Sequence, residues 1–206
     1  APRAGQGDCT AGAPQLCTAA MTQLQAFIIP VTPFQQNCSL VFDKEKKVGA
    51  VVDPGGDVPV ILDAIKKSGV KVEKILLTHG HIDHAGGAAE LREKLGVMIE
   101  GPHEADKYLL DNVPQSGARY GMLTAREVTP DRWLKDGDEV EVAGFRFAII
   151  HAPGHSPGSV VFFNDANRFA LMGDVLFQGS IGRTDFPRGS HETLLDSIEK
   201  KVLPLG

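Results

Sequence analysis

The chain lacks the features that would place it in a membrane or on nucleic acid. No apolar run approaches the ~20 residues that a membrane-spanning helix needs, and the N-terminal residues lack the apolar core of a signal peptide. Basic residues number 21 against 26 acidic ones, for a formal net charge of −5, and no basic run is interleaved with aromatic residues. We therefore expect no membrane partner, no nucleic-acid partner and no secretion.

Cysteine is also scarce. The three cysteines, Cys9, Cys17 and Cys38, form an odd set without the spacing of a metal site. Free thiols suit a reducing compartment, because disulfides persist mainly in oxidising ones. The sequence thus predicts a cytoplasmic protein.

The chain is long enough for one domain with a substantial core, since it has 206 residues of which 42% are hydrophobic. Residues 1–20 are rich in Ala, Gly, Pro and Thr, show no periodicity and are followed by Met21, which resembles an original start. We expect residues 1–20 to be a flexible tail or a remnant of cloning, and residues 21–206 to form the domain.

The densest chemical signal is the stretch Thr78–Gly87, which holds His79, His81, Asp83 and His84 within six positions. A buried strand over 70–78 precedes it and a helix over 86–95 follows, so the cluster lies where a strand ends, as ligand sites of α/β sheets do. Residues two apart in an extended segment face the same way, so His79 and His81 can reach one ion. Histidine and carboxylate donors without cysteine favour zinc first, then iron or manganese.

Hydrophobic periodicity predicts an α/β fold that begins with antiparallel strands. Expected strands are 24–31, 38–42, 48–52, 97–99, 140–150, 160–163 and 169–172. One expected helix begins after Asp57 and ends at Gly69, and a second runs over 104–111. A third begins after Ser190 and ends at Pro204. Residues 112–130 show no clear pattern and are expected to form an irregular excursion near the site.

Two further polar stretches follow strands in the same way. His151 and His155 lie in a Gly/Pro-rich loop, and Asp174 follows the pair 160–163 and 169–172. Alone, His151 also fits a buried core histidine and Asp174 a turn cap. Because loops at strand ends converge, we expect these residues near the Thr78–Gly87 cluster.

From Leu24 onward the chain resembles the metallo-β-lactamase-fold hydrolases, and among them the small type II glyoxalase-like enzymes. The resemblance is carried by Asp53-Pro54-Gly55-Gly56, the Thr78–Gly87 cluster, Pro153-Gly154-His155-Ser156-Pro157-Gly158, Gly173-Asp174 and Gly182-Arg183-Thr184-Asp185-Phe186. It implies a four-layer αβ/βα sandwich with two mixed sheets face to face and helices outside.

The resemblance also implies a ligand set. The first metal site would use His79, His81 and His155, the second Asp83 and His84, and Asp174 would bridge the two. Arg183 falls where related glyoxalases place a basic residue that contacts glutathione, and a guanidinium suits a carboxylate. Asp53 resembles a residue that braces the metal loop rather than a ligand.

One element of the family is not found in this sequence. The family has a strand after the last helix and a Gly-His-Gly loop that supplies the second metal's last histidine, whereas this sequence ends at Gly206. We expect one firmly bound zinc and a weak second one. An unpaired sheet edge would favour a homodimer.

The resemblance implies hydrolysis of a glutathione thioester such as S-lactoylglutathione. A metal site with an open position lowers the pKa of bound water, and the resulting metal-bound hydroxide, oriented by Asp83, would attack the thioester carbonyl. Alternatives on the same scaffold are an iron-dependent persulfide dioxygenase that uses His79, His155 and Asp174, a hydrolase of lactones, β-lactams or phosphodiesters, and a metal-binding protein without catalysis.

Overall fold

The fold is described by a computed structural model over residues 23–206. The predicted tail over residues 1–20 lies outside the described residues, as do Cys9 and Cys17. Within residues 23–206, no helix is long and apolar enough to cross a membrane.

The first sheet has five strands in the order β1-β2-β3-β4-β5. Its first two pairings are antiparallel and the next two are parallel, so the sheet is mixed. The strands are β1 (Leu24–Val31), β2 (Gln36–Asp43), β3 (Val48–Val52), β4 (Lys71–Leu76) and β5 (Met98–Glu100).

The second sheet has four strands in the order β6-β7-β8-β9, all antiparallel. The strands are β6 (Glu139–Val142), β7 (Phe145–His151), β8 (Val160–Asn164) and β9 (Phe169–Leu171). A small separate hairpin joins β10 (Leu176–Phe177) and β11 (Ser180–Ile181).

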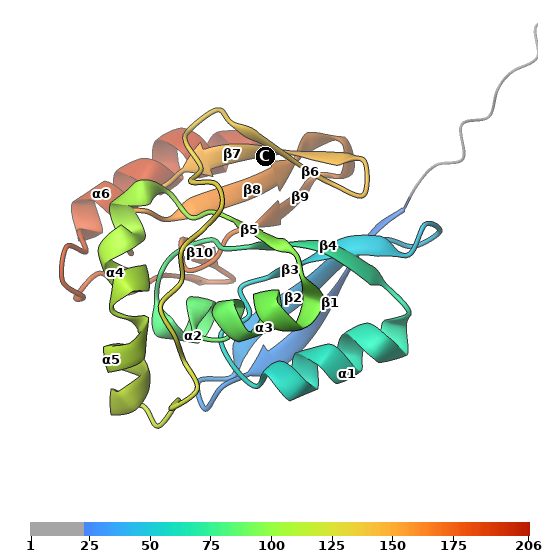
Figure 1. Ribbon diagram of the computed structural model, residues 1–206. Helices are drawn as coiled ribbons and strands as arrows, with labels where there is room; N and C mark the ends of the chain where they lie inside the picture. The colour runs from blue at the N-terminus through green and yellow to red at the C-terminus, as the bar shows by residue number, and fades with distance from the viewer. Residues whose placement is uncertain (1–22) are drawn as a thin grey trace, which may run out of the picture.

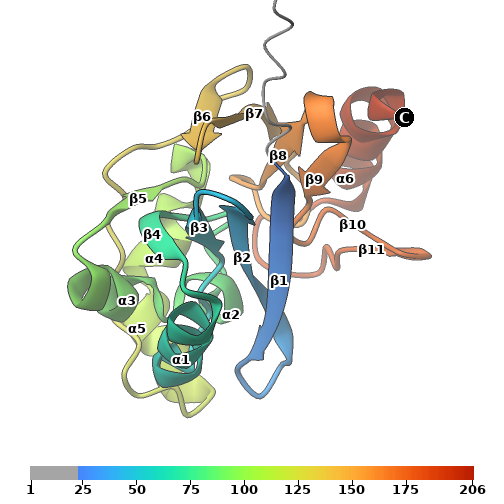
Figure 2. The same cartoon turned by 90° about the vertical axis from the view of Figure 1, so that its right-hand side faces the viewer.

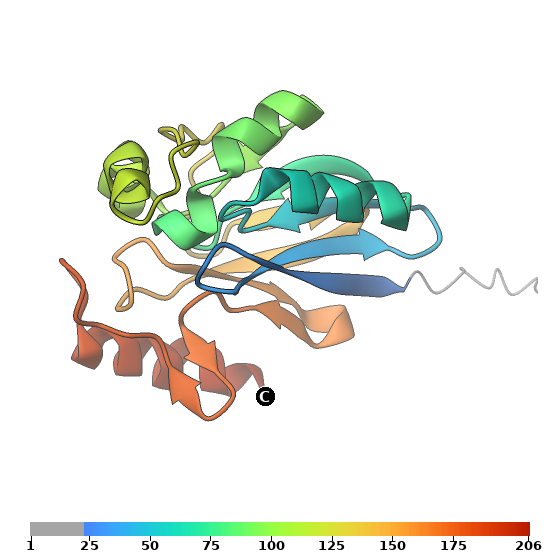
Figure 3. The ribbon, with the colours of Figure 1, turned by 90° about the horizontal axis from the view of Figure 1, so that it is seen from below.

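Helices cover the outer faces of both sheets. Viewed toward the edge strand β1, the order from left to right is α1 and α3, the first sheet, the second sheet, and α6 (Figure 2). The view from below shows the same succession (Figure 3). The helices are α1 (Val58–Ser68), α2 (Ile82–Ala85), α3 (Ala88–Leu95), α4 (Lys107–Asp111), α5 (Val113–Arg119) and α6 (His191–Ser197) (Figure 1). Helix α6 continues as a π-helical segment over Ile198–Val202 and a 3₁₀ turn over Leu203–Leu205.

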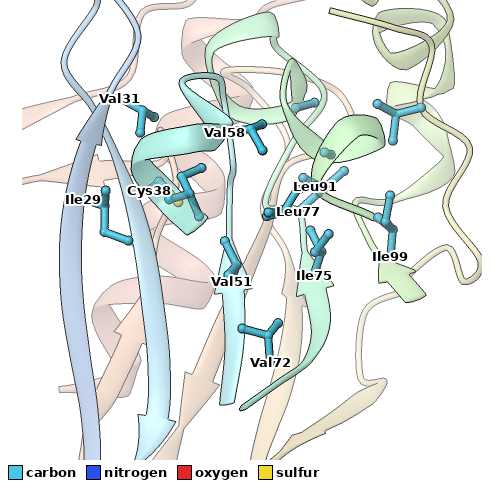
Figure 4. Close-up of a cluster of buried hydrophobic side chains, with 14 of the residues drawn as sticks. Ile29, Val31, Cys38, Val51, Val58, Val72, Ile75, Leu77, Leu91 and Ile99 are labelled. Atoms are coloured by element: carbon cyan, nitrogen blue, oxygen red, sulfur yellow. The ribbon is translucent and has the colours of Figure 1, made fainter. Parts of the chain in front are cut away.

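Three apolar cores separate the four layers, because the central strands bury both faces. Side chains of β1–β4 that point outward, such as Val51 and Ile75, pack with Ile61 and Leu91 of the covering helices (Figure 4). Their neighbours Ala50 and Leu76 point inward and pack on the second sheet. A third core joins the second sheet to α6. The predicted four-layer αβ/βα sandwich is confirmed, but the prediction that both sheets are mixed is wrong, because every pairing in the second sheet is antiparallel.

Most predicted elements are found, with four corrections. The predicted strand 140–150 is two strands, β6 and β7, that turn at Ala143-Gly144, where both residues have positive φ. The irregular excursion predicted over 112–130 contains α5. The helix predicted from residue 86 is preceded by the short helix α2, so Asp83 and His84 are helical. The π-helical segment after α6 was not predicted, and within residues 23–206 no strand follows it.

Candidate metal centre

The candidate site is built by three loops that meet at one end of the two sheets. His79 and His81 lie between β4 and α2, His155 lies between β7 and β8, and Asp174 follows β9. The backbone N–H of Val160 donates to the carbonyl of Thr78 at 2.8 Å, which joins the loops of the two sheets directly. The predicted residues are therefore brought together from distant parts of the chain.

The first cluster consists of His79, His81 and His155, and each offers one ring nitrogen that lies within 4.8 Å of the other two. Nε2 of His155 lies 2.8 Å from Nδ1 of His81 and 3.2 Å from Nε2 of His79. Nitrogens around one tetrahedral zinc ion are about 3.3 Å apart, given Zn–N bonds of about 2.0–2.1 Å. The spacing thus fits three ligands of one cation.

The outer ring nitrogens fix which atoms face the cluster. Nδ1 of His155 lies 2.7 Å from the carbonyl oxygen of Arg183 and can only donate to it, so Nε2 carries the lone pair. Nδ1 of His79 lies 3.1 Å from Oγ1 of Thr78, and that hydroxyl donates to Asp53 Oδ2 at 2.6 Å. His79 is therefore also oriented with a free Nε2. Such outer contacts are typical of histidines that bind metal.

Electrostatics also favour a cation in this cluster. Burial, together with the neighbouring histidines, holds the pKa of His79 well below its ordinary value. Burial and the nearby His155 lower the pKa of His81 to about 3. A neutral imidazole presents one lone pair, and ring nitrogens that converge on one point can direct their lone pairs at a bound cation. The donor set fits a metal ion.

The second cluster consists of Asp83, His84 and Asp174. Nε2 of His84 lies 3.2 Å from Oδ1 of Asp174 and 3.7 Å from Oδ2 of Asp83. The other oxygen of Asp174 lies 3.5 Å from Nε2 of His155. One carboxylate of Asp174 therefore reaches both clusters, which is the arrangement that a bridging ligand requires.

Asp53 lies within reach of His79 and His84 and could be taken for a ligand. Its oxygens are occupied, however: Oδ1 accepts the backbone N–H of Thr78 at 2.7 Å, and Oδ2 accepts the Thr78 hydroxyl and Nδ1 of His84 at 3.0 Å. We therefore assign Asp53 to the support of the metal loop. Burial alone would lower the pKa of His84, but Asp53 and Asp174 outweigh it and raise that pKa well above its ordinary value.

The loop over residues 182–189 covers the first cluster. The ring of Phe186 lies 4.7 Å from that of His81 and 5.7 Å from that of His155. The guanidinium of Arg183 is exposed, pairs with Asp185 at 2.8 Å and lies over Phe186. The structure thus places Arg183 on the loop that borders the cluster, while its role in substrate binding stays a prediction.

Three histidines are not part of either cluster. The rings of His103 and His151 stack on each other with centroids 4.1 Å apart, and Nε2 of His151 donates to the carbonyl of Pro157. His191 is exposed at the first turn of α6. Of the two candidates in the 151–158 loop, only His155 reaches the metal cluster, although its role as a ligand stays a prediction.

Sequence reasoning assigned no role to Thr78, Phe186 or Asp106. Thr78 was included in the motif, but only the geometry shows that its hydroxyl connects His79 to Asp53. Phe186 was quoted as part of the Gly182–Phe186 resemblance without a function. Asp106 lies in a segment of weak periodicity, so no local signal indicated it.

A groove of about 480 Å³ reaches the second cluster from solvent. Asp83, His84 and Asp174 lie along it, and its walls include Phe34 and Phe177. Side chains of Asp83 and Asp174 are about a quarter exposed, at 27% and 25%. A small molecule can therefore approach the two carboxylates without any change of fold.

Comparison with known proteins agrees with this architecture. Residues 31–205 match the family described as the metallo-beta-lactamase superfamily. The chain is 48% identical over 179 residues to hydroxyacylglutathione hydrolase GloC of Haemophilus influenzae, which covers 86% of this chain and 84% of that protein.

Two solved structures are also similar. BLEG-1, described as a B3 metallo-beta-lactamase, has a TM-score of 0.80 and 34% identity, covering 88% of this chain and 87% of that one. TTHA1623, described in a di-iron-bound form, has a TM-score of 0.74 and 33% identity, covering 84% of each chain.

Proposed function

This chain belongs to the metallo-beta-lactamase superfamily, and we propose that it is a hydrolase of glutathione thioesters such as S-lactoylglutathione. It is a metallo-hydrolase of that superfamily. The observation that carries the proposal is the convergence of ring nitrogens from His79, His81 and His155 beside the carboxylate of Asp174.

Zinc is the proposed metal, and when bound it would polarise the thioester carbonyl and lower the pKa of water. His79, His81, His155 and Asp174 would hold the first ion. Asp83, His84 and Asp174 would hold a second, weaker one. Imidazole and carboxylate donors also suit iron or manganese, and the relative in a di-iron-bound form supports iron as the alternative.

The chain's own groups would orient the reactants. Asp83 lines the groove, and its carboxylate would accept a hydrogen bond from the attacking water, which would aim the water's lone pair at the carbonyl carbon. The ring of Phe186 lies against His81 and would form an apolar wall beside the cluster. The leaving group is a thiolate, which needs little general-acid help, and accordingly no separate acid is assigned.

The choice of a glutathione thioester is supported by two findings. A relative with 48% identity is named as a hydroxyacylglutathione hydrolase. Arg183 presents an exposed guanidinium on the loop that borders the first cluster, where it would exchange Asp185 for a carboxylate of glutathione.

A persulfide dioxygenase activity is the second candidate. Nε2 of His155 lies 3.2 Å from Nε2 of His79 and 3.5 Å from Oδ2 of Asp174, so two histidines and one carboxylate are close enough for the iron site of an oxygenase. A β-lactam substrate is the third to test, because the similar BLEG-1 is described as a B3 metallo-beta-lactamase.

The test is elemental analysis of protein purified without chelator, combined with three assays on the same sample. We expect zinc, release of free thiol from S-lactoylglutathione, no oxygen uptake with glutathione persulfide and little β-lactam hydrolysis. Iron with oxygen uptake would support the dioxygenase instead. Stoichiometric metal without turnover of any substrate would identify a metal-binding protein. The cytoplasmic location and the homodimer stay predictions from the sequence.

A further inference from the structure

Asp106 is a fully buried carboxylate that lies between the two loops of the first metal cluster. It ends the 3₁₀ turn Glu104–Asp106, which leads into α4. Burying a carboxylate without partners costs several kcal/mol, so its hydrogen bonds show what the residue is placed to hold.

All hydrogen-bond partners of the Asp106 carboxylate belong to the two loops. Oδ2 accepts the backbone N–H of Gly80 at 2.9 Å and the hydroxyl of Ser156 at 2.7 Å. Oδ1 accepts the backbone N–H of Gly158 at 2.6 Å. Gly80 separates His79 from His81, and Ser156 directly follows His155. The carboxylate is therefore bonded to the chain beside all three histidines.

The two glycines are shaped to admit this side chain. A Cβ on Gly158 would lie 2.5 Å from Cγ of Asp106, and a Cβ on Gly80 would lie 2.8 Å from Cβ of Leu109 and 3.3 Å from Cβ of Asp106. A side chain at Gly80 or Gly158 would therefore push its loop away from the segment that carries Asp106. The close approach and the hydrogen bonds therefore specify one separation of the two loops.

We propose that Asp106 is a positioning residue that fixes the separation of the His79–His81 loop from the His155 loop and thereby sets the affinity of the first metal site. The inference rests on the metal-binding part of the proposed function, and it is independent of the thioester substrate. It predicts that Asp106 acts on the metal without touching it.

The test is Asp106→Asn. Every partner of the carboxylate can donate, and an amide offers one oxygen in place of two. Whichever way the amide is turned, its NH₂ group faces the N–H of Gly80 or of Gly158, so at least one hydrogen bond between Asp106 and the loops is lost. We expect zinc affinity, measured by competition with a chromophoric chelator, to fall about 10- to 100-fold, as when outer contacts of metal ligands are removed. The visible spectrum of the cobalt-substituted protein should also change.

Asp43→Asn is the matched control. Asp43 is also fully buried and accepts two backbone N–H groups, from Glu45 and Lys46, both at 2.9 Å. Asp43 is the last residue of β2. The residue of β2 that contacts His84 is Gln36, at the other end of the strand. The loss of this buried negative charge should leave zinc affinity and the cobalt spectrum unchanged, even if the melting temperature falls in both variants.

Ser156→Ala covers the case in which Asp106→Asn does not fold. It removes one of the three donors and leaves the carboxylate and both glycines, so we expect a smaller loss of zinc affinity, about 3- to 10-fold. If Asp106→Asn has the zinc affinity and the cobalt spectrum of the wild-type protein, the inference is overturned and the proposed function is not. If only Ser156→Ala folds, wild-type values in that variant overturn the inference in the same way. Wild-type protein that binds no metal would refute the proposed function and this inference with it.

Discussion

At the scale of single residues, the histidines of the site are defined by what their outer nitrogens contact. His79 is held through Thr78 to Asp53, and His155 is held by the carbonyl of Arg183. His151 lies four residues before His155 but bonds Pro157 instead. Chemical type alone therefore does not make a ligand, since orientation decides which lone pair is available.

This contrast gives the first prediction. His79→Ala and His155→Ala should each lose most of the bound metal, because each removes one of three converging nitrogens, whereas His151→Ala should retain it. Metal content after gel filtration, by elemental analysis, is the measurement. Equal loss of metal from all three variants would show that the ligand assignment is wrong.

Arg183 carries the second prediction. Arg183→Ala should raise KM for S-lactoylglutathione about ten- to a hundredfold, because the variant loses a charge-assisted hydrogen bond to a carboxylate of glutathione. Short acyl thioesters without the glutathione carboxylates should show little change. The same rise in KM for both substrates would assign Arg183 to the support of the loop, where it already pairs with Asp185.

At the scale of elements, α6 connects the metal loops to the third core. Ser190 caps the helix, as the sequence predicted: its Oγ accepts the Thr193 N–H at 3.2 Å, and its own N–H donates to the carbonyl of Gly154 at 2.8 Å. Leu194 and Ile198 then bury themselves against the second sheet. The start of the helix thus lies directly on the loop that carries His155.

Ser190→Ala should therefore lower the free energy of unfolding by about 1 kcal/mol, the usual cost of a lost N-cap. Its metal affinity should stay unchanged, because the bond from Ser190 to Gly154 uses the backbone. Urea denaturation of the metal-free protein is the measurement, with Ser190→Thr as the control that keeps a capping oxygen. A loss as large in Ser190→Thr as in Ser190→Ala would argue against the cap.

Elements with strong periodicity were predictable from the sequence, and those set by tertiary contacts were not. Strands β1 and β3 were predicted with the bounds that the structure shows, because hydrophobic runs between turn residues mark them. Helix α5 was missed because it is short and Gly117 lowers its helix propensity, and packing of Val113 stabilises it instead. Asp106 could not be found, since its partners lie 26 to 52 residues away.

At the scale of the whole molecule, the candidate metal centre joins the two sheets. His79 and His81 belong to a loop of the first sheet, and His155 and Asp174 belong to loops of the second. A metal ion bound to all of them would connect both halves of the sandwich. Binding and stability are therefore linked, because a ligand of the folded state stabilises it.

Zinc at 100 times its dissociation constant should raise the free energy of unfolding by about 2.7 kcal/mol over the metal-free protein. Thermal unfolding with and without a chelator measures this. His155→Ala should show little of the increase. A wild-type protein whose melting temperature is the same with zinc and with chelator would show that no metal joins the sheets.

The most direct test of the account is a zinc titration of metal-free protein, with S-lactoylglutathione hydrolysis followed in the same samples through loss of thioester absorbance. We predict no hydrolysis without metal and activity that appears as the first equivalent of zinc binds. One ion per chain should survive dialysis and a second should be lost, because the second cluster offers only Asp83, His84 and the shared Asp174 among the described residues. Hydrolysis by the metal-free protein, or a filled first site without hydrolysis of this thioester, would contradict the account.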